Sequence, residues 1–154
     1  MEINQLNLKF DTGSNPKLNE FYSQFQEILE KLKHQKLPSE AVQYINNIVE
    51  HINSTTLQDK ALLKLLKDKQ NIIIKYLEKE HKIVPKNYYK KLWLAVGMTA
   101  FGLPIGVVFG LLMGNIGLMA IGLPIGLGFG AAVGSSMDKK ALQEGRQIDV
   151  ELKF

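Results

Sequence analysis

The sequence predicts a mainly α-helical protein, in which a cytoplasmic bundle of about three helices is followed by a two-helix transmembrane hairpin. Three observations lead to this fold class. The 46 residues from Leu92 to Met137 contain no Lys, Arg, Asp, Glu or His, although 22% of the whole chain is charged. Within this run, the phrase GLPIGVVFG at 102–110 recurs as GLPIGLGFG at 122–130. Before the run, apolar residues recur at the three- and four-residue spacing of amphipathic helices.

The uncharged run is long enough to cross a bilayer twice. A helix needs about 20 apolar residues to span the hydrocarbon core, and Gly114 and Asn115 are turn-forming residues near the middle of the run. We therefore predict two helical spans, at about 91–113 and 116–137, because open strands would leave backbone groups unpaired in lipid. The alternative is a glycine-rich hairpin in a soluble core, for which a chain of 154 residues offers little covering material.

Two rows of glycines within the run follow a spacing of four residues. This spacing keeps residues on one helix face, and small residues allow membrane helices to make close backbone contact. The predicted helix-packing residues are Gly102, Gly106, Gly110, Gly114, Gly122, Gly126, Gly130 and Gly134. If the chain folds back near position 116, glycines such as Gly102 and Gly130 lie at equal depth. Equal depth favours packing within one chain, and packing between subunits is the alternative.

Prolines and flanking residues add two further predictions. Pro104 and Pro124 are predicted kinks, because each removes a backbone N–H and frees a carbonyl one turn earlier; such a kink is either a simple bend or a hinge that lines a wet cavity. Lysine and aromatic side chains beside the run are typical of membrane-interface anchors. The predicted anchors are Lys86, Tyr88, Tyr89, Lys90, Lys91, Trp93, Lys139 and Lys140.

The distribution of charge predicts location and partners. By the positive-inside rule, lysines at both outer ends of a hairpin place both termini in the cytoplasm. The excess of Lys over Arg, with frequent Asn and Ile, suggests an AT-rich bacterial genome, so we expect the membrane to be the bacterial inner membrane. Residues 1–59 carry a net charge of −3 and residues 60–91 a net charge of +7. The basic stretch would meet anionic lipid headgroups at about 1 kcal/mol per Lys. We expect no nucleic-acid partner, since the basic stretch lacks a recognisable binding motif.

Three regions follow from these patterns. Residues 1–85 form the cytoplasmic helical region, 86–140 the hairpin and 141–154 a cytoplasmic tail. The helices are expected at about 17–36, 39–53 and 56–82, with Ser39 as the N-cap of the second, Thr56 and Asp59 as a capping box for the third, and Pro85 ending the third. The third helix either packs in the bundle or lies on the membrane through its lysine face.

Alternating polar and apolar residues predict a short strand near each terminus. The first runs from Leu6 to Phe10 and is followed by a turn at 11–16, and the second runs from Ile148 to Phe154. Because both termini lie on one side of the membrane in this reading, we expect the two strands to pair with each other or with a second subunit.

The sequence predicts no enzyme. His34, His51 and His81 have no ligand partner at metal-binding spacing, and the chain has no cysteine, no nucleophile elbow and no phosphate-binding loop. We therefore expect no catalytic residue, no metal and no cofactor.

The GLPIG phrase occurs twice, the sequence DKKA follows at 138–141, and apolar and polar residues alternate over 148–154. In these features the chain resembles the glycine-zipper family of small, largely uncharacterised bacterial membrane proteins. The resemblance covers about residues 88–154 and implies no active residues. Two functions remain open. One is a membrane module whose cytoplasmic helices bind or position an unidentified protein partner. The other is a homo-oligomeric pore or membrane-disrupting effector, which the absence of polar lining on the spans makes less favoured.

Overall fold

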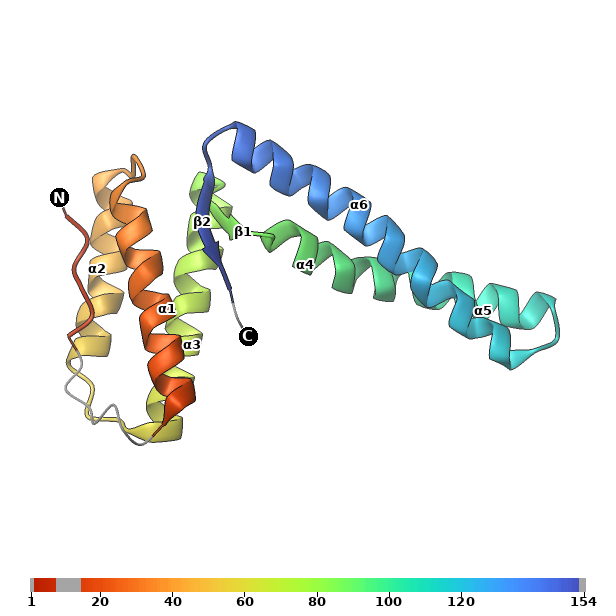
Figure 1. Cartoon of the computed structure of the whole chain (residues 1–154), viewed down its shortest axis with the longest axis horizontal. Coiled ribbons are helices and arrows are strands. Elements are labelled where there is room, and N and C mark those ends of the chain that lie inside the picture. The colour runs from red at the N-terminus through yellow and green to blue at the C-terminus, as the bar shows by residue number, and fades with distance from the viewer. Residues whose placement is uncertain (1, 8–14, 153–154) are drawn as a thin grey trace. The chain divides into compact units, whose positions relative to one another are not determined.

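The computed structural model of the chain describes residues 2–7 and 15–152, and it confirms a mainly α-helical fold (Figure 1). The chain divides into two compact units. The first comprises Met1–Pro85 together with Ile148–Phe154, and the second comprises Lys86–Gln147. The predicted separate tail, 141–154, is therefore divided: residues up to Gln147 belong to the hairpin unit, and Ile148–Phe154 belongs to the first unit.

Three helices build the first unit: α1 (Pro16–Lys33), α2 (Ser39–Asn53) and α3 (Asp59–Tyr76), which lie side by side in Figure 1. Each turns one apolar face inward, as the three- and four-residue spacing predicts. The side chains buried most completely include Phe25, Ile28, Leu29, Leu32, Ile45, Val49, Ile52, Leu62, Leu66 and Ile73. At the start of α1, the Asn15 side chain accepts a hydrogen bond from the Leu18 N–H at 3.3 Å, and Pro16 occupies the first helical position, where its missing N–H costs nothing.

The predicted helix ends were wrong in three places. Ser39 is the first residue of α2 and not its cap, because the extended Pro38 occupies the cap position. Gln58 precedes α3 and makes no side-chain capping bond, so Thr56 and Asp59 form no capping box. The third helix continues as a π-helical segment, η1 (Leu77–His81), and ends there because Lys82 adopts a left-handed conformation (φ 56°), so Pro85 lies beyond its end.

A two-stranded parallel sheet joins β1 (Val84–Lys86) to β2 (Gln147–Glu151). The C-terminal strand is thus confirmed over 147–151, but its predicted partner was wrong. Residues 2–7 form no strand, because side chains of the bundle satisfy their backbone hydrogen-bonding groups in place of a second strand. The described residues do not include the rest of the predicted N-terminal strand, most of the turn that follows it, or Phe154.

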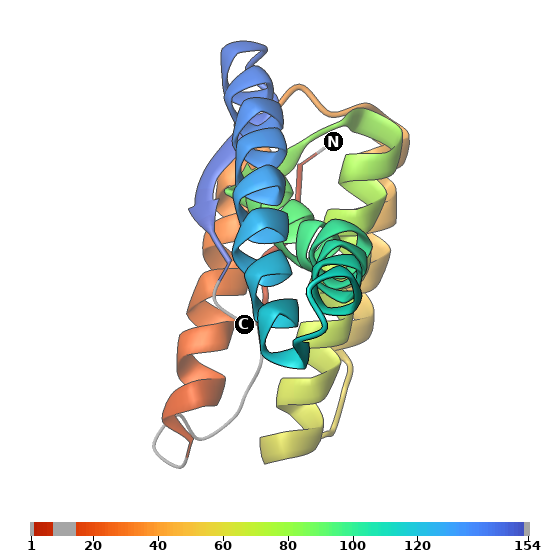
Figure 2. The same cartoon turned by 90° about the vertical axis from the view of Figure 1, so that its right-hand side faces the viewer.

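The second unit is a helical hairpin with two long arms. The first arm contains α4 (Tyr88–Val96), the π-helical segment η2 (Gly97–Gly102) and α5 (Leu103–Leu112). The second contains the 3₁₀ segment η3 (Ile116–Ile121) and α6 (Gly122–Gln143). Figure 2 shows the arms running beside each other. The helices reach beyond the predicted spans, from Tyr88 in the first arm and to Gln143 in the second, because charged residues at both outer ends continue the helices.

Candidate functional site: the glycine-packed hairpin

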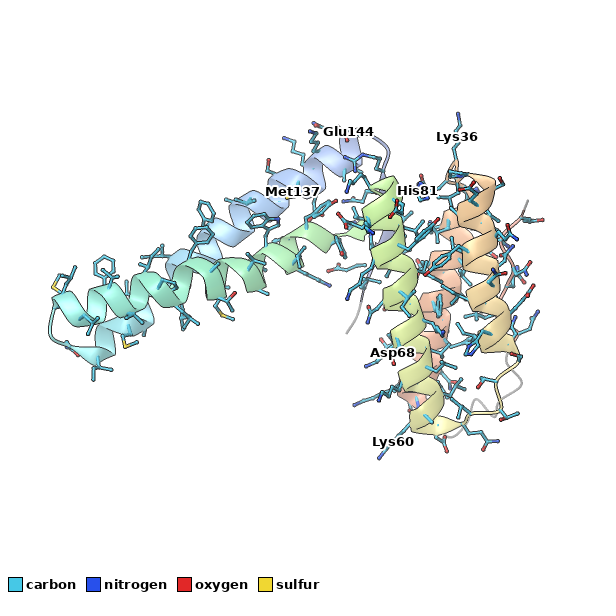
Figure 3. The ribbon with its side chains drawn as sticks, turned by 180° about the vertical axis from the view of Figure 1, so that it is seen from behind. Lys36, Lys60, Asp68, His81, Met137 and Glu144 are labelled. Carbon is cyan, nitrogen blue, oxygen red and sulfur yellow. The ribbon has the colours of Figure 1, made fainter. Side chains whose placement is uncertain are left out.

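The hairpin exposes its apolar side chains. Both arms, Tyr88–Leu112 and Ile116–Gln143, are long and apolar enough to cross a membrane, yet only 22% and 17% of their most apolar windows are buried. A core helix of a soluble protein would be mostly buried. Around the turn, Leu111, Leu112 and Ile116 are each about 80% exposed, and apolar side chains project outward along both arms in Figure 3. The hairpin is therefore a pair of candidate membrane spans.

The inner faces of the two arms meet through glycine backbone. A Cβ atom placed on Gly122 would lie well within 3.0 Å of the Gly102 carbonyl oxygen and of the Gly106 backbone. Further from the turn, a Cβ on Gly126 would meet the Gly97 carbonyl oxygen just as closely. Real Cβ atoms essentially never show such separations, so these positions accept no side chain without moving the backbone.

The glycine contact continues to the open end of the hairpin. A Cβ on Gly130 would overlap the Trp93 carbonyl oxygen, and one on Gly134 would lie 2.5 Å from the Lys90 Cα. The two rows thus pack against each other, or against adjoining backbone, within one chain.

The predicted register of this packing was wrong. Gly102 lies opposite Gly122 and Gly126, not Gly130, and Gly97, which stands outside the four-residue rows, joins the contact. The two arms advance at different rates along the hairpin. A 3₁₀ segment rises about 2.0 Å per residue against about 1.5 Å in an α-helix, so η3 covers more depth with fewer residues.

Of the two glycines nearest the turn, Gly110 packs against the other arm as predicted and Gly114 does not. Gly114 adopts a left-handed conformation (φ 62°), and nothing lies within 4 Å of a Cβ placed there. It is a turn residue, assisted by the Asn115 side chain, which accepts a hydrogen bond from the Gly117 N–H at 2.9 Å. A Cβ on Gly110 would meet mainly the flexible side chain of Met119, at 2.6 Å, so this position is more adaptable than the inner ones.

Replacing Gly114 with alanine is expected to destabilise the hairpin by about 1–2 kcal/mol, because a left-handed conformation brings Cβ close to the following carbonyl oxygen. Gly114→Asn is the matched variant, since asparagine visits this conformation more readily, and it should cost less. The measurement is thermal unfolding in detergent followed by Trp93 fluorescence. Equal stability of both variants and the unmodified protein would show that the turn does not need this backbone conformation.

Both prolines lie where the helical hydrogen-bond pattern changes. Pro104 is the second residue of α5, directly after the π segment η2, and Pro124 is the third residue of α6, directly after the 3₁₀ segment η3. A missing N–H costs least at such positions, because the regular α-helical ladder is already interrupted. Whether either proline acts as a hinge stays a prediction.

At the open end of the hairpin, Asp138 connects the two arms. Its carboxylate accepts hydrogen bonds from the backbone N–H groups of Tyr89, at 3.0 Å, and Lys90, at 2.9 Å. These amides belong to the first turn of α4, where N–H groups have no partner within the helix and a negative charge is favoured by the helix dipole. With 7% of its surface exposed, Asp138 is nearly buried.

Sequence reasoning missed this role, because Asp138 stands beside two lysines directly after the uncharged run. One signal could have identified it: Asp138 is the only acidic residue between Glu80 and Glu144. In a hairpin it also lies level with the start of the first arm, which needs an acceptor for its unpaired N–H groups.

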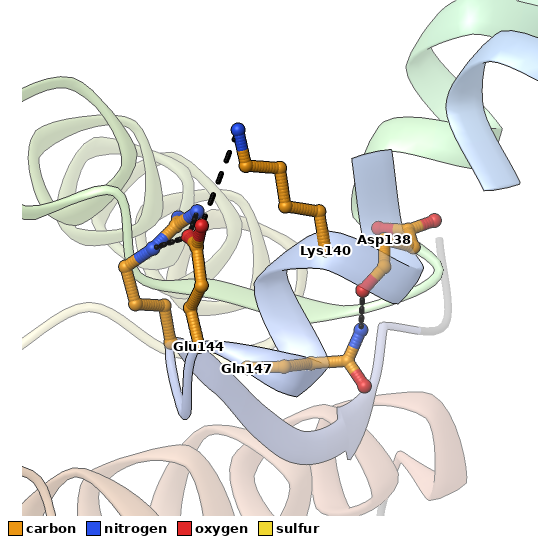
Figure 4. A network of polar contacts seen from close by, with 5 residues as sticks. Asp138, Lys140, Glu144 and Gln147 are labelled. Atoms are coloured by element: carbon orange, nitrogen blue, oxygen red, sulfur yellow. Dashed lines mark hydrogen bonds and ion pairs between the residues drawn. The ribbon is translucent and has the colours of Figure 1, made fainter. Parts of the chain in front are cut away.

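Beyond Asp138, a polar network turns the chain out of α6 (Figure 4). The Gln147 side-chain amide donates to the Asp138 carbonyl oxygen at 3.4 Å, and the Arg146 Nε donates to the Glu144 carboxylate at 2.8 Å. The hydrogen bond from Arg146 holds the pKa of Glu144 below its ordinary value, with a further contribution from Lys140 at 4.0 Å. Gly145, at φ 68°, provides the left-handed residue that this turn requires.

The predicted interface anchors gather at the open end of the hairpin. Lys86, Tyr88, Tyr89, Lys90, Lys91 and Trp93 lie just before or within the first turns of α4, and Lys139 and Lys140 lie in the last turns of α6. The Asp138 hydrogen bonds hold these two ends together. The tyrosine rings of 88 and 89 pack edge to face with centroids 5.4 Å apart.

Among the described residues, no three His, Asp or Glu side chains come together in a way that could hold a metal ion. No protein-family model, no curated protein and no solved structure matches the chain. The resemblance to glycine-zipper proteins therefore stays a prediction.

Proposed function

We propose that this protein is a non-enzymatic membrane module, whose hairpin anchors a cytoplasmic helical bundle that binds or positions a partner protein. The membrane is the bacterial cytoplasmic membrane, and both termini face the cytoplasm. One observation carries the proposal: the two arms bury their backbone against each other and leave the surrounding apolar side chains exposed. Water offers no favourable environment for such a surface, whereas lipid does.

The polar groups within the arms fit a lipid environment. The Thr99 hydroxyl donates to the Ala95 carbonyl oxygen at 2.9 Å, which satisfies it inside its own helix. The first arm contains no titratable residue between Lys91 and the turn, and the second contains none before Asp138. Since charges at mid-membrane mark ion or proton pathways, their absence supports an anchor.

The charges at the open end support the orientation. Lysines from the start of the first arm and the end of the second lie at the same end of the hairpin, where anionic headgroups would meet them. The opposite end carries only Gly114, Asn115 and apolar neighbours, so it crosses the membrane without transferring a charge.

A homo-oligomeric pore is the second candidate. Its specific support is Gly128, which has nothing within 4 Å of an added Cβ and so offers a second small-residue face on α6. Against it, the main glycine contacts are already used between the two arms of one chain, and the spans carry no charged lining.

Membrane fractionation and vesicle leakage together test these functions. We expect the protein to remain in bacterial membranes through an alkaline carbonate wash and to be released by detergent. Purified protein at high loading should leave dye-filled vesicles intact. Release into the soluble fraction by carbonate would contradict the anchor, and dye release would favour the pore.

A further inference from the structure

The N-terminal segment, residues 2–7, lies in a groove between α1 and α2. Its two apolar side chains point into the bundle: Ile3 is 4% and Leu6 is 1% exposed, whereas its other residues are exposed. Ile3 lies close to Leu32 of α1 and Val42 of α2, with which it lines one small pocket. The segment therefore presents two apolar residues, three positions apart, to a helical surface.

Side-chain amides of α2 hold the backbone of this segment. The Asn46 side chain accepts from the Asn4 N–H at 2.8 Å and donates to the Glu2 carbonyl oxygen at 2.9 Å. The Asn53 side chain repeats the pattern, accepting from the Asn7 N–H at 2.8 Å and donating to the Gln5 carbonyl oxygen at 3.0 Å. Each carboxamide thus offers one donor and one acceptor, as a neighbouring β-strand would.

The spacing of these two amides matches an extended chain. Asn46 and Asn53 are seven positions apart, a distance of about 10.5 Å along a helix. Their targets are three residues apart on the segment, which is about 10 Å along an extended chain. From α1, the Tyr22 hydroxyl adds a bond to the Leu6 carbonyl oxygen at 2.7 Å. All of these bonds go to backbone, so they do not depend on the identity of the bound residues.

A carboxylate stands on each rim of the groove. On the α1 side, Glu30 accepts from the Gln5 side-chain amide at 3.0 Å and from Lys33 of its own helix at 2.8 Å. On the α2 side, Glu50 accepts from the neutral Asn4 side-chain amide at 3.5 Å, although a cationic side chain makes the stronger bond to a carboxylate.

We infer that the α1–α2 groove is a peptide-binding site, and that residues 2–7 occupy it as an internal stand-in for a partner protein's segment. The ligand is an extended stretch with two apolar residues three apart and a basic residue directly after the first of them, opposite Glu50. This inference deepens the proposed function by naming the surface through which the anchored bundle takes its partner. The resident segment competes through its attachment, since a tethered ligand has an effective concentration of the order of millimolar. A partner's segment competes through the charge of its basic residue.

A binding assay with the full-length protein in lipid nanodiscs tests the inference. Ile3→Asp combined with Leu6→Asp should empty the groove. The probes are fluorescent synthetic peptides with the sequence of residues 1–10, either unchanged or carrying Asn4→Lys. The emptied variant should bind both peptides saturably, and the lysine-containing peptide about threefold more tightly, as expected for one exposed ion pair. The unmodified protein should bind at least about a hundredfold more weakly, because its own segment competes.

Asparagine variants provide the matched control. In the emptied protein, Asn46→Ala should weaken peptide binding about tenfold, because it leaves two backbone groups of the peptide unpaired. Asn47→Ala, on the exposed side of the same helix, should leave binding unchanged. A helical, emptied variant that binds neither peptide would overturn the inference, and so would equal binding by the two alanine variants.

Hydrogen exchange on the unmodified protein gives a second test that requires no variant. If the segment leaves its groove while the bundle stays folded, the amides of Asn4 and Asn7 should exchange at least about a hundredfold faster than the amide of Ile45 in the core. Equal rates would show that the segment is inseparable from the bundle and would overturn the inference. Neither outcome affects carbonate resistance or vesicle integrity, so failure here is distinguishable from failure of the membrane anchor.

Discussion

Replacing Gly126 with leucine is expected to separate the two arms of the hairpin. A Cβ at this position would overlap the Gly97 carbonyl oxygen and lie 2.7 Å from the Gly102 Cα. Because these neighbours are backbone atoms, they cannot rotate away as a side chain could, and we expect a loss of about 3 kcal/mol or more in hairpin stability. The loss is measured as earlier thermal unfolding in detergent, followed by the fluorescence of Trp93, the only tryptophan.

Gly128 supplies the matched control, two residues further along the same helix. Nothing lies within 4 Å of a Cβ placed there, so Gly128→Leu should unfold at nearly the temperature of the unmodified protein. If Gly128→Leu instead changes only the size of the oligomer in mild detergent, the face of α6 that carries Gly128 mediates self-association. Similar losses for Gly126→Leu and Gly128→Leu would refute the packing of the arms described above.

Asp138→Ala is expected to release the open end of the hairpin. The substitution removes the side-chain acceptor of the Tyr89 and Lys90 N–H groups in the first turn of α4. Removing the side chain that caps a helix costs about 0.5–2 kcal/mol. Hydrogen exchange measures the effect directly, since the amides of Tyr89 and Lys90 should exchange faster in the variant.

Two further variants separate the role of the carboxylate from that of charge alone. Asp138→Asn retains one acceptor oxygen and should lose less stability than Asp138→Ala. Lys139→Ala removes an exposed charge from the next residue and should leave both amides protected. If Lys139→Ala accelerates their exchange as much as Asp138→Ala does, the connection between the arms does not depend on the hydrogen bonds.

Much of the fold could be predicted from the sequence. The charge-free run and its central Gly114–Asn115 pair located both apolar helices and the turn to within a few residues, because length and polarity decide these features locally. The amphipathic spacing likewise located the three bundle helices. The ends of α2 and α3 were less predictable, since several residues near each end, such as Thr56 and Gln58, could take the capping position.

Features that depend on distant neighbours could not be predicted as well. The register of the glycine rows depends on the 3₁₀ segment at 116–121, which leaves no periodic signal. The strand at 147–151 was visible, but its partner was not, because alternation does not identify which segment lies alongside. The use of Asn46 and Asn53 to bind the N-terminal segment escaped prediction for a similar reason. On α2 alone, each is an ordinary polar residue of an amphipathic helix.

Site-directed thiol labelling tests the central claim most directly, that the hairpin crosses the membrane and returns to the same side. The chain contains no cysteine, so a single introduced cysteine is unique. We predict that Asn115→Cys, in the turn, reacts with a membrane-impermeant maleimide in intact bacterial cells, once the outer envelope admits the reagent. Ser54→Cys and Gln143→Cys, on the side that we propose is cytoplasmic, should react only after the inner membrane is permeabilised. Equal labelling of all three cysteines in intact cells, or protection of Asn115→Cys alone, would contradict this topology.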